Sequence, residues 1–381
     1  MIRFTKLNTL HGGLMVGVLA LTSLSSCQAF NKDIRRITLP SKEQQSVTSL
    51  ISNSPTRCIG TYLIELPVGF KAYKEGIFYY KSSGDITITT KQQYLPPFKQ
   101  MIAQRKQDLE NTKPLDQIYG KYLKQVYKVQ TNNPDKIQGI IFERMVKPGM
   151  RDVLRVLEGY RWQDDVTLQI EMKARNGSGE LYAKDRIKDP ESYANNVSQK
   201  LIELRKLFDR IKPRDDLTIP TTPGFCMFNS FMQGEDREWK DMNYGYRHDN
   251  SNDYFSFYFE FNDFADDYAL LDKPEAYFTQ GSGHTIYKGT RESHGLKLEE
   301  WVVKGKYFEE PQVVNNNYTD YIFTLGIHIT DPTYKTPRLR VEMTYRVPED
   351  KTQGYTEEQL MIIWREITNT IRIRKSAFES E

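Results

Sequence analysis

The sequence predicts an α+β fold with two similar domains in tandem, each an antiparallel sheet packed with helices. Three segments of the first half recur in the same order in the second half: 139–146 matches 295–302, 168–174 matches 339–345, and 199–214 matches 359–374. The first two pairs alternate like strands, and the third pair has the apolar spacing of a helix. A proline-rich stretch at 212–225 is the natural linker. We therefore expect an N-terminal domain over 46–216 and a C-terminal domain over 217–381.

The first half contains predicted strands and two predicted helices. Alternating apolar and polar residues indicate strands over 77–80, 86–90, 122–130, 139–146, 153–162 and 166–174. A helix over 96–114 begins and ends at prolines, and its apolar face consists of Phe98, Met101, Ile102 and Leu109. For the closing helix we expect Asp189 as the N-cap and Pro190 in the first turn. Its apolar stripe consists of Tyr193, Val197, Leu201, Leu204, Phe208 and Ile211.

The second half follows the same plan. Strands are predicted over 253–261, 296–303, 321–329 and 338–346. The first of these places four phenylalanines on one face: Phe255, Phe257, Phe259 and Phe261. Thr356 and Gln359 have the spacing of a capping box. The helix that follows has an apolar stripe of Leu360, Ile363, Trp364, Ile367 and Ile371. No segment matches the helix over 96–114, so the halves have diverged there.

The N-terminal residues have the pattern of an export signal. Arg3 and Lys6 precede an apolar stretch at 12–24, which is shorter than the roughly 20 residues of a membrane-spanning helix. The sequence "LSSC" then ends at Cys27 and resembles a bacterial lipobox, which implies a signal peptide over 1–26 and lipidation of the Cys27 thiol. The alternative is an ordinary signal peptide with a chance cysteine.

The residues after the lipobox indicate where the protein is held. Residues 27–45 are assigned to the lipidated N-terminus and tether, and the polar stretch at 41–54 is expected to join lipid and body. Gln28, in place of an aspartate, favours the outer membrane in enteric-type bacteria. We therefore expect a periplasmic protein that contacts the membrane only through its N-terminal lipid.

Composition and motifs exclude several classes of function. Loss of Arg3 and Lys6 with the signal leaves a nearly neutral chain, and no long basic run is present, so nucleic acid is not an expected partner. Neither G-x-S-x-G, H-E-x-x-H nor a phosphate-binding P-loop occurs. His284 and His294 leave a shared metal or catalytic pair as a minor alternative to a flexible hairpin. We therefore expect a protein that is not an enzyme and needs no cofactor or metal.

Two cysteines remain in the body, Cys58 and Cys226, each at the start of its half. Exported proteins usually pair their cysteines, so a disulfide is the preferred interpretation. Two separate buried thiols are the alternative, and a nucleophile is the least favoured because no histidine lies in a recognisable protease motif. The geometry of the two sites decides between a bridge and separate thiols.

The segment 233–253 concentrates aromatic and arginine residues in polar surroundings. Such residues are the usual anchors of protein interfaces, and a long loop inside a compact domain is often functional. We therefore assign a partner-binding surface to Arg237, Trp239, Tyr244, Tyr246 and Arg247. An ordinary hairpin and loop is the alternative.

The lipobox, "CIGTYLIELP" at 58–67 and "PGFC" at 223–226 together resemble the immunity proteins that neutralise type VI secretion lipase effectors. The similarity extends from about residue 46 to residue 374, although "MFNSFMQG" follows the second motif where family members often have glycines. The resemblance implies a two-domain periplasmic antidote that binds a cognate lipase or phospholipase effector and protects membrane phospholipid from hydrolysis. An envelope assembly or structural lipoprotein without a toxin partner is the alternative, and a periplasmic hydrolase with an unrecognised site is a further one.

Overall fold

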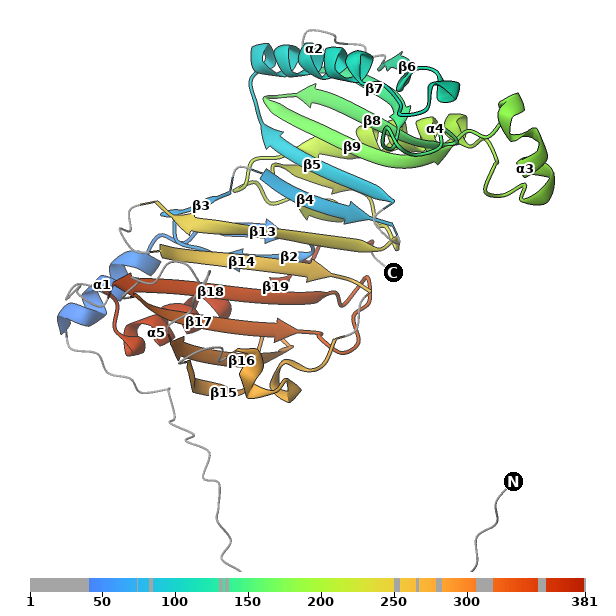
Figure 1. Ribbon diagram of the computed structural model, residues 1–381. Coiled ribbons are helices and arrows are strands. Elements are labelled where there is room, and N and C mark those ends of the chain that lie inside the picture. Colours follow the sequence, from blue (N-terminus) through green and yellow to red (C-terminus); the bar gives the residue numbers. More distant parts are fainter. Residues whose placement is uncertain are drawn as a thin grey trace, which may run out of the picture. The chain divides into compact units, whose positions relative to one another are not determined.

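Most strands of the chain belong to one antiparallel sheet. The computed structural model describes residues 41–73, 75–81, 85–129, 133, 137–249, 254–264, 267–278, 283–305, 318–348 and 354–379. Within them the sheet has 13 strands (Figure 1). The first half supplies, in spatial order, β4 (Glu75–Tyr80), β5 (Ile86–Gln92), β9 (Val166–Arg175), β8 (Leu154–Gln163), β7 (Ile137–Met145) and β6 (Leu123–Lys128).

The second half repeats this topology. From the strand next to β4 outward, the order is β13 (Lys240–His248), β14 (Tyr254–Asn262), β18 (Arg338–Pro348), β17 (Tyr318–Ile327), β16 (Leu296–Gly305) and β15 (His284–Ser293). The short strand β3 (Phe70–Ala72) also pairs with β13. The two halves are joined where β4 pairs with β13, with Phe78 opposite Met242. The prediction of two similar α+β domains in tandem is therefore confirmed, and their sheets form one continuous sheet.

The structural repeat also corrects one detail of the sequence repeat. Leu168 lies opposite Arg161, and Leu339 lies opposite Ile327, so these pairs of strands are equivalent. The next strands in the two halves are β7, which pairs with β8, and β16, which pairs with β17. Their registers make Phe142 of β7 equivalent to Trp301 of β16. The sequence matched the correct strands, β7 and β16, but in a register that is shifted by three residues.

Two small sheets show that the halves exchange their short C-terminal strands, here called tails. The hairpin of β1 (Thr56–Ile59) and β2 (Tyr62–Glu65) begins the first half but pairs with β19 (Arg372–Ile373) at the end of the second half. The hairpin of β11 (Gly224–Met227) and β12 (Ser230–Gln233) begins the second half but pairs with β10 (Ile211–Pro213), the tail of the first. Each half therefore completes the other.

The helices lie between or beside these strands. They are α1 (Ser41–Ile51), α2 (Leu95–Asn111), α3 (Ala183–Lys188), α4 (Val197–Arg210) and α5 (Glu357–Thr368), with short 3-10 helices η3 (Gln117–Tyr119), η4 (Glu180–Tyr182), η5 (Leu270–Asp272) and η6 (Glu275–Tyr277). Among the described residues, no helix is long and apolar enough to cross a membrane. The predicted capping box of Thr356 and Gln359 is confirmed at the start of α5.

Two expectations about where helices lie were wrong. The closing helix of the first half begins at Val197, with Asn196 as its N-cap residue, and the Val197 N–H donates to the side-chain oxygen of Asn195 at 3.2 Å; Asp189 is instead the C-cap residue of α3. The polar stretch expected to be a tether contains α1, which packs against α5. Val47 of α1 is buried, and Gln359 donates to the Ser46 hydroxyl at 2.9 Å.

Helices and hairpins cover one face of the sheet. The predicted row of four phenylalanines on β14 is fully buried on this face, where Phe257 stacks on Trp364 of α5. On the opposite face α2 packs over Phe142, Tyr160 and Trp162 at one end. The segment of η5 and η6 packs over Trp301 and Val303 at the other end. Among the residues that the structure describes, no helix packs over this face of the strands between these two covers.

Candidate functional site

The segment 233–253, predicted as one partner-binding loop, is largely strand. Met242, Tyr244 and Tyr246 alternate along β13 and point toward the helix-covered face, so Tyr244 is 3% exposed and Tyr246 is not exposed. The Tyr244 hydroxyl donates to the Cys58 carbonyl at 3.4 Å. Assignment of these two tyrosines to a partner surface was therefore wrong: they belong to the core.

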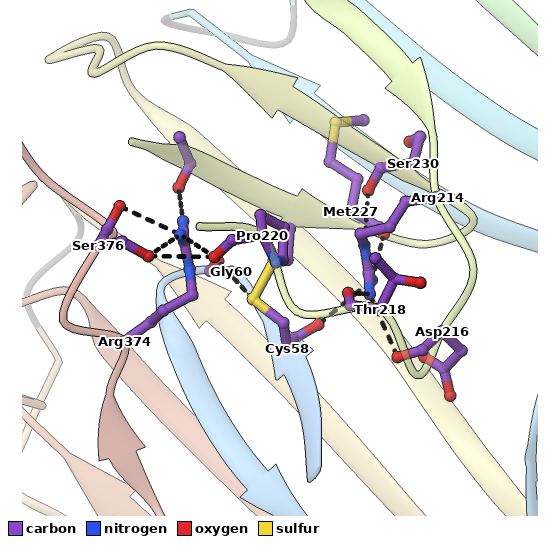
Figure 2. The surroundings of a disulfide bond; sticks show 12 residues. Cys58, Gly60, Arg214, Asp216, Thr218, Pro220, Met227, Ser230, Arg374 and Ser376 are labelled. Carbon is purple, nitrogen blue, oxygen red and sulfur yellow. Dashed lines mark hydrogen bonds between the residues drawn. A yellow bond between two sulfur atoms is a disulfide. The ribbon is translucent and has the colours of Figure 1, made fainter. Parts of the chain in front are cut away.

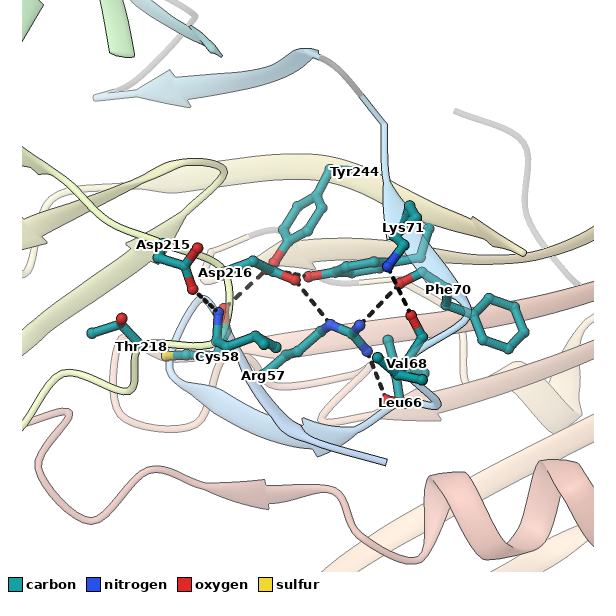
Figure 3. A network of polar contacts seen from close by, with 12 residues as sticks. Arg57, Cys58, Leu66, Val68, Phe70, Lys71, Asp215, Asp216, Thr218 and Tyr244 are labelled. Atoms are coloured by element: carbon teal, nitrogen blue, oxygen red, sulfur yellow. Dashed lines mark hydrogen bonds and ion pairs between the residues drawn. The ribbon is translucent and has the colours of Figure 1, made fainter. Parts of the chain in front are cut away.

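Arg57 and Asp216 form a network of polar contacts that holds the linker (Figure 3), and Tyr246 takes part in it. The Arg57 guanidinium lies 4.9 Å from the Tyr246 ring centroid and donates to Asp216 at 2.9 Å. Its other nitrogens donate to the carbonyls of Leu66 at 2.8 Å and Phe70 at 2.9 Å. The Tyr246 hydroxyl donates to Asp216 at 2.7 Å, and burial raises the Tyr246 pKa well above its usual value. The proline-rich linker is thus fixed to both halves.

A disulfide joins Cys58 to Cys226, with the Cα atoms 5.8 Å apart. It connects β1 of the first half to β11 of the second, and the N–H of Gly60 donates to the Cys226 carbonyl beside it at 2.9 Å. The sequence left a bridge and two separate thiols open, and the structure has the bridge. It locks together the two hairpins that exchange partners.

Two buried arginines flank this disulfide (Figure 2). Arg214 donates to the carbonyls of Cys58 and Met227 at 3.4 and 3.2 Å. Arg374 donates to the carbonyls of Pro220, Thr222 and Gly224 at 3.0, 2.9 and 2.6 Å. Burial, together with the nearby Arg214 charge, lowers the pKa of Arg374 to about 10. Backbone carbonyls therefore hold both charges at the junction of the halves.

The other three predicted partner residues remain accessible but lie apart. Arg237 is exposed, with its guanidinium 5.2 Å from the Tyr334 ring centroid. Trp239 is half-buried and packs edge-to-face on Phe264 at 4.1 Å between ring centroids. Arg247 is exposed near the opposite end of β13. A role of these three side chains in binding stays a prediction.

An apolar surface missed by the sequence reasoning lies on the uncovered face of the sheet. We call it the central face and define it by Ile77, Tyr79, Asp241, Asn243, Tyr258 and Glu260. In the ladders, Tyr79 lies opposite Asp241, and Asn243 lies between Ile77 and Glu260. Ile77 is 47% exposed, Tyr79 36% and Tyr258 41%. A sheet with one wet face normally turns polar residues outward, so adjoining exposed apolar side chains indicate a contact surface.

Charged side chains lie within the central face and beside it. Glu260 pairs with Arg338 at 2.6 Å and with Arg340 at 3.9 Å. Burial, with the neighbouring Glu260 charge, raises the pKa of Asp241, and burial also raises the pKa of Glu342. The carboxyl groups are thus already partly shielded from water. Protein–protein interfaces combine buried apolar contacts with polar ones, and the central face offers both kinds of side chain.

The histidines do not form the alternative metal site. His284 begins β15 and His294 follows its last residue, so the strand separates them by about 30 Å. In the part of the chain that the structure describes, no group of three or more His, Cys, Asp or Glu side chains is placed to hold a metal ion.

Two family models together match most of the chain. The Tle cognate immunity protein 4 N-terminal domain matches residues 55–214, and the Tle cognate immunity protein 4 C-terminal domain matches residues 218–376. The chain belongs to the Tle cognate immunity protein 4 family. Members of this family are immunity proteins with a Tle effector as cognate partner, so this chain is an immunity protein that binds a type VI secretion lipase effector.

Solved structures share the fold of this Tle cognate immunity protein. The apo structure of the immunity protein TplEi of the T6SS from Pseudomonas aeruginosa has a TM-score of 0.61 at 16% identity, covering 86% of this chain and 98% of that chain. The Tli4 fold in the Tle4–Tli4 complex has a TM-score of 0.61 at 17% identity, covering 86% of this chain and 99% of the other. No curated protein sequence matches the chain.

Proposed function

We propose that this Tle cognate immunity protein silences its effector in the periplasm by stoichiometric binding and without catalytic turnover. Membership of the immunity family carries the proposal. The Tle4–Tli4 complex is a solved complex of a relative with the same fold, which supports direct binding as the mode of action. The producing cell would thereby protect its membrane phospholipid from a sibling's lipase.

The effector docks on the central face in this proposal. The central face is formed by strand β4 of the first half and by β13 and β14 of the second, so one bound partner contacts both halves. The near-neutral charge of the chain gives little long-range steering, so buried apolar and aromatic anchors supply most of the affinity. Ile77, Tyr79 and Tyr258 are the candidate anchors.

A lipid on Cys27 holds the protein at the membrane, with the outer membrane as the proposed site. Cys27 and the signal segment lie outside the described residues, so the lipobox pattern is the support. Because α1 begins at Ser41 and packs on α5, only residues 27–40 remain as tether. Fully extended, they reach at most about 50 Å, which keeps the body close to the membrane surface.

Co-production in cells tests the function. A cognate effector directed to the periplasm should kill cells, and export of this chain should restore growth. The same chain without its signal segment should not restore growth, because it stays in the other compartment. Rescue by the non-exported chain, or no rescue at all, would contradict the proposal and favour an envelope assembly role.

Mass spectrometry of the membrane fraction tests the anchor. The N-terminal residue should be an acylated Cys27, and Cys27→Ser should release the protein from the membrane fraction. An unmodified Cys27 thiol in periplasmic protein would reject lipidation while leaving effector binding in place.

A further inference from the structure

Arg161 is a buried charge at a position where the fold accepts an apolar residue. It lies on β8 and is 5% exposed. Its ladder partner Leu168 is equivalent to Leu339 of the second half, whose ladder partner is Ile327. Ile327 is fully buried. Because the second half builds the same sheet with isoleucine there, the topology does not require the guanidinium.

The Arg161 guanidinium has no acidic partner of its own. Among the described residues it makes no ion pair, and its one side-chain hydrogen bond is donated to the Ile211 carbonyl. Its Nε is buried without a hydrogen-bond partner. Burial lowers the pKa of Arg161 to about 10, although the charges of Asp209 and Asp164 act in the opposite direction. A buried cation of this kind normally has a paired anion.

Arg161 lines a pocket with an excess of positive charge, here called the Arg161 pocket. The cationic side chains around it are Lys128, Arg161, Arg205 and Lys212, and Asp209 is the acidic one. Burial and the Arg161 charge lower the pKa of Lys212. Arg161 and Lys212 thus repel each other in a partly desolvated site, and a multivalent anion would relieve that repulsion.

We propose that the Arg161 pocket binds a phosphate group. Phosphate carries a charge of about −1.5 to −2 at pH 7 and offers several strong acceptor oxygens. Two guanidinium groups present planar donor forks that match those oxygens, and lysines add point charges. The ligand is inorganic phosphate or the phosphate of a lipid headgroup, since both present the same chemistry.

Titration of the chain from residue 27, produced without lipidation, tests the site. One arm uses inorganic phosphate against chloride at matched ionic strength, with binding measured by calorimetry and by the rise in Tm that a native-state ligand causes. The second arm uses phosphatidylcholine vesicles with and without phosphatidic acid. Arg205→Ala and Lys212→Ala should each weaken binding about tenfold, the effect of one lost charge-assisted hydrogen bond.

Lys206→Ala is the matched control, because Lys206 neighbours Arg205 on α4 but lines a different pocket. It should leave the affinity unchanged. Arg161→Leu should abolish binding while the protein still unfolds cooperatively, as expected where the equivalent residue is Ile327. Saturable binding of inorganic phosphate identifies a free-ion site, and binding only to vesicles with phosphatidic acid identifies a headgroup site. The proposal is overturned by no binding in either arm, or by equal losses in Lys206→Ala and Arg205→Ala.

Discussion

The backbone N–H of Arg374 donates to the carbonyl of Thr61 at 2.8 Å, so the tail of the second half closes the first hairpin of the chain. Arg214 makes the equivalent bond to Asn229 at 2.9 Å, which closes the hairpin of the second half with the tail of the first. This reciprocal exchange means that a chain cut at the linker would leave both hairpins without their third strand. We therefore expect the intact body, and neither half alone, to be the unit that binds an effector.

Loss of the Arg374 side chain should destabilise the junction strongly. Arg374→Leu leaves the carbonyls of Pro220, Thr222 and Gly224 without this donor, and we expect a loss of about 3 kcal/mol in the free energy of unfolding. Lys375→Ala is the control, because Lys375 is exposed and surface changes usually stay within about 0.5 kcal/mol. Urea unfolding measures both. Equal stabilities of the two variants would show that the carbonyl contacts contribute little.

The disulfide should stabilise the exchanged hairpins. Cys58 and Cys226 are 168 residues apart in sequence, so the bond restricts a long loop of the unfolded chain. We expect Cys58→Ser with Cys226→Ser to lower the free energy of unfolding by about 2–4 kcal/mol. A reductant should lower the stability of the parent by a similar amount and leave the double variant unaffected. A parent that is indifferent to reductant would contradict this role.

Acid should weaken the contact between α2 and the sheet through Glu158. This carboxylate is fully buried and accepts from Arg105 at 2.6 Å and from the Tyr160 hydroxyl at 2.6 Å. Burial opposes its ionisation, but the hydrogen bonds from Arg105 and Tyr160 and the Arg144 charge bring its pKa below the ordinary value of 4.5. Its stabilisation is therefore complete above pH 4.5 and is lost as the pH falls through the lower, folded-state pKa.

Glu158→Gln tests this pH dependence. At pH 7 the variant should be less stable by about 3 kcal/mol, because the buried Arg144 and the partly exposed Arg105 lose their common anion. The difference from the parent should shrink as the pH falls from 5 to 3. Glu110→Gln on the exposed side of α2 is the control, since Glu110 pairs with Lys106 at the surface. If the difference in unfolding free energy between Glu158→Gln and the parent stays constant with pH, titration of Glu158 is ruled out as the cause.

Sequence periodicity predicted the regular elements well, because local apolar spacing determines them. The phenylalanines of β14 and the Thr356 capping box were found this way. The exchange of tails could not be found, since β19 has two residues and its pairing depends on tertiary contacts. Period-2 alternation of Met242, Tyr244 and Tyr246 was present in the sequence. It would have identified β13, but the arginines and aromatic residues around it favoured a loop.

The central face had a sequence signal too. Ile77 and Tyr79 alternate with Phe78 and Tyr80, so both faces of β4 carry large apolar side chains. A strand with one wet face should not show this pattern. The sequence could not show which part of this face the helices would cover. In the structure, α2 covers one end and the segment of η5 and η6 covers the other, and no other described helix packs over the strands between them.

The affinity of the mature chain for its cognate effector tests the central claim most directly. Ile77→Ala and Tyr258→Ala should each weaken binding by about 2 kcal/mol, roughly 30-fold, with unchanged thermal stability because both side chains are partly exposed. Ile187→Ala is the matched control, because Ile187 is 83% exposed on α3, outside the central face, and it should bind like the parent. Calorimetric titration in which both central-face variants bind as tightly as the parent would contradict the account.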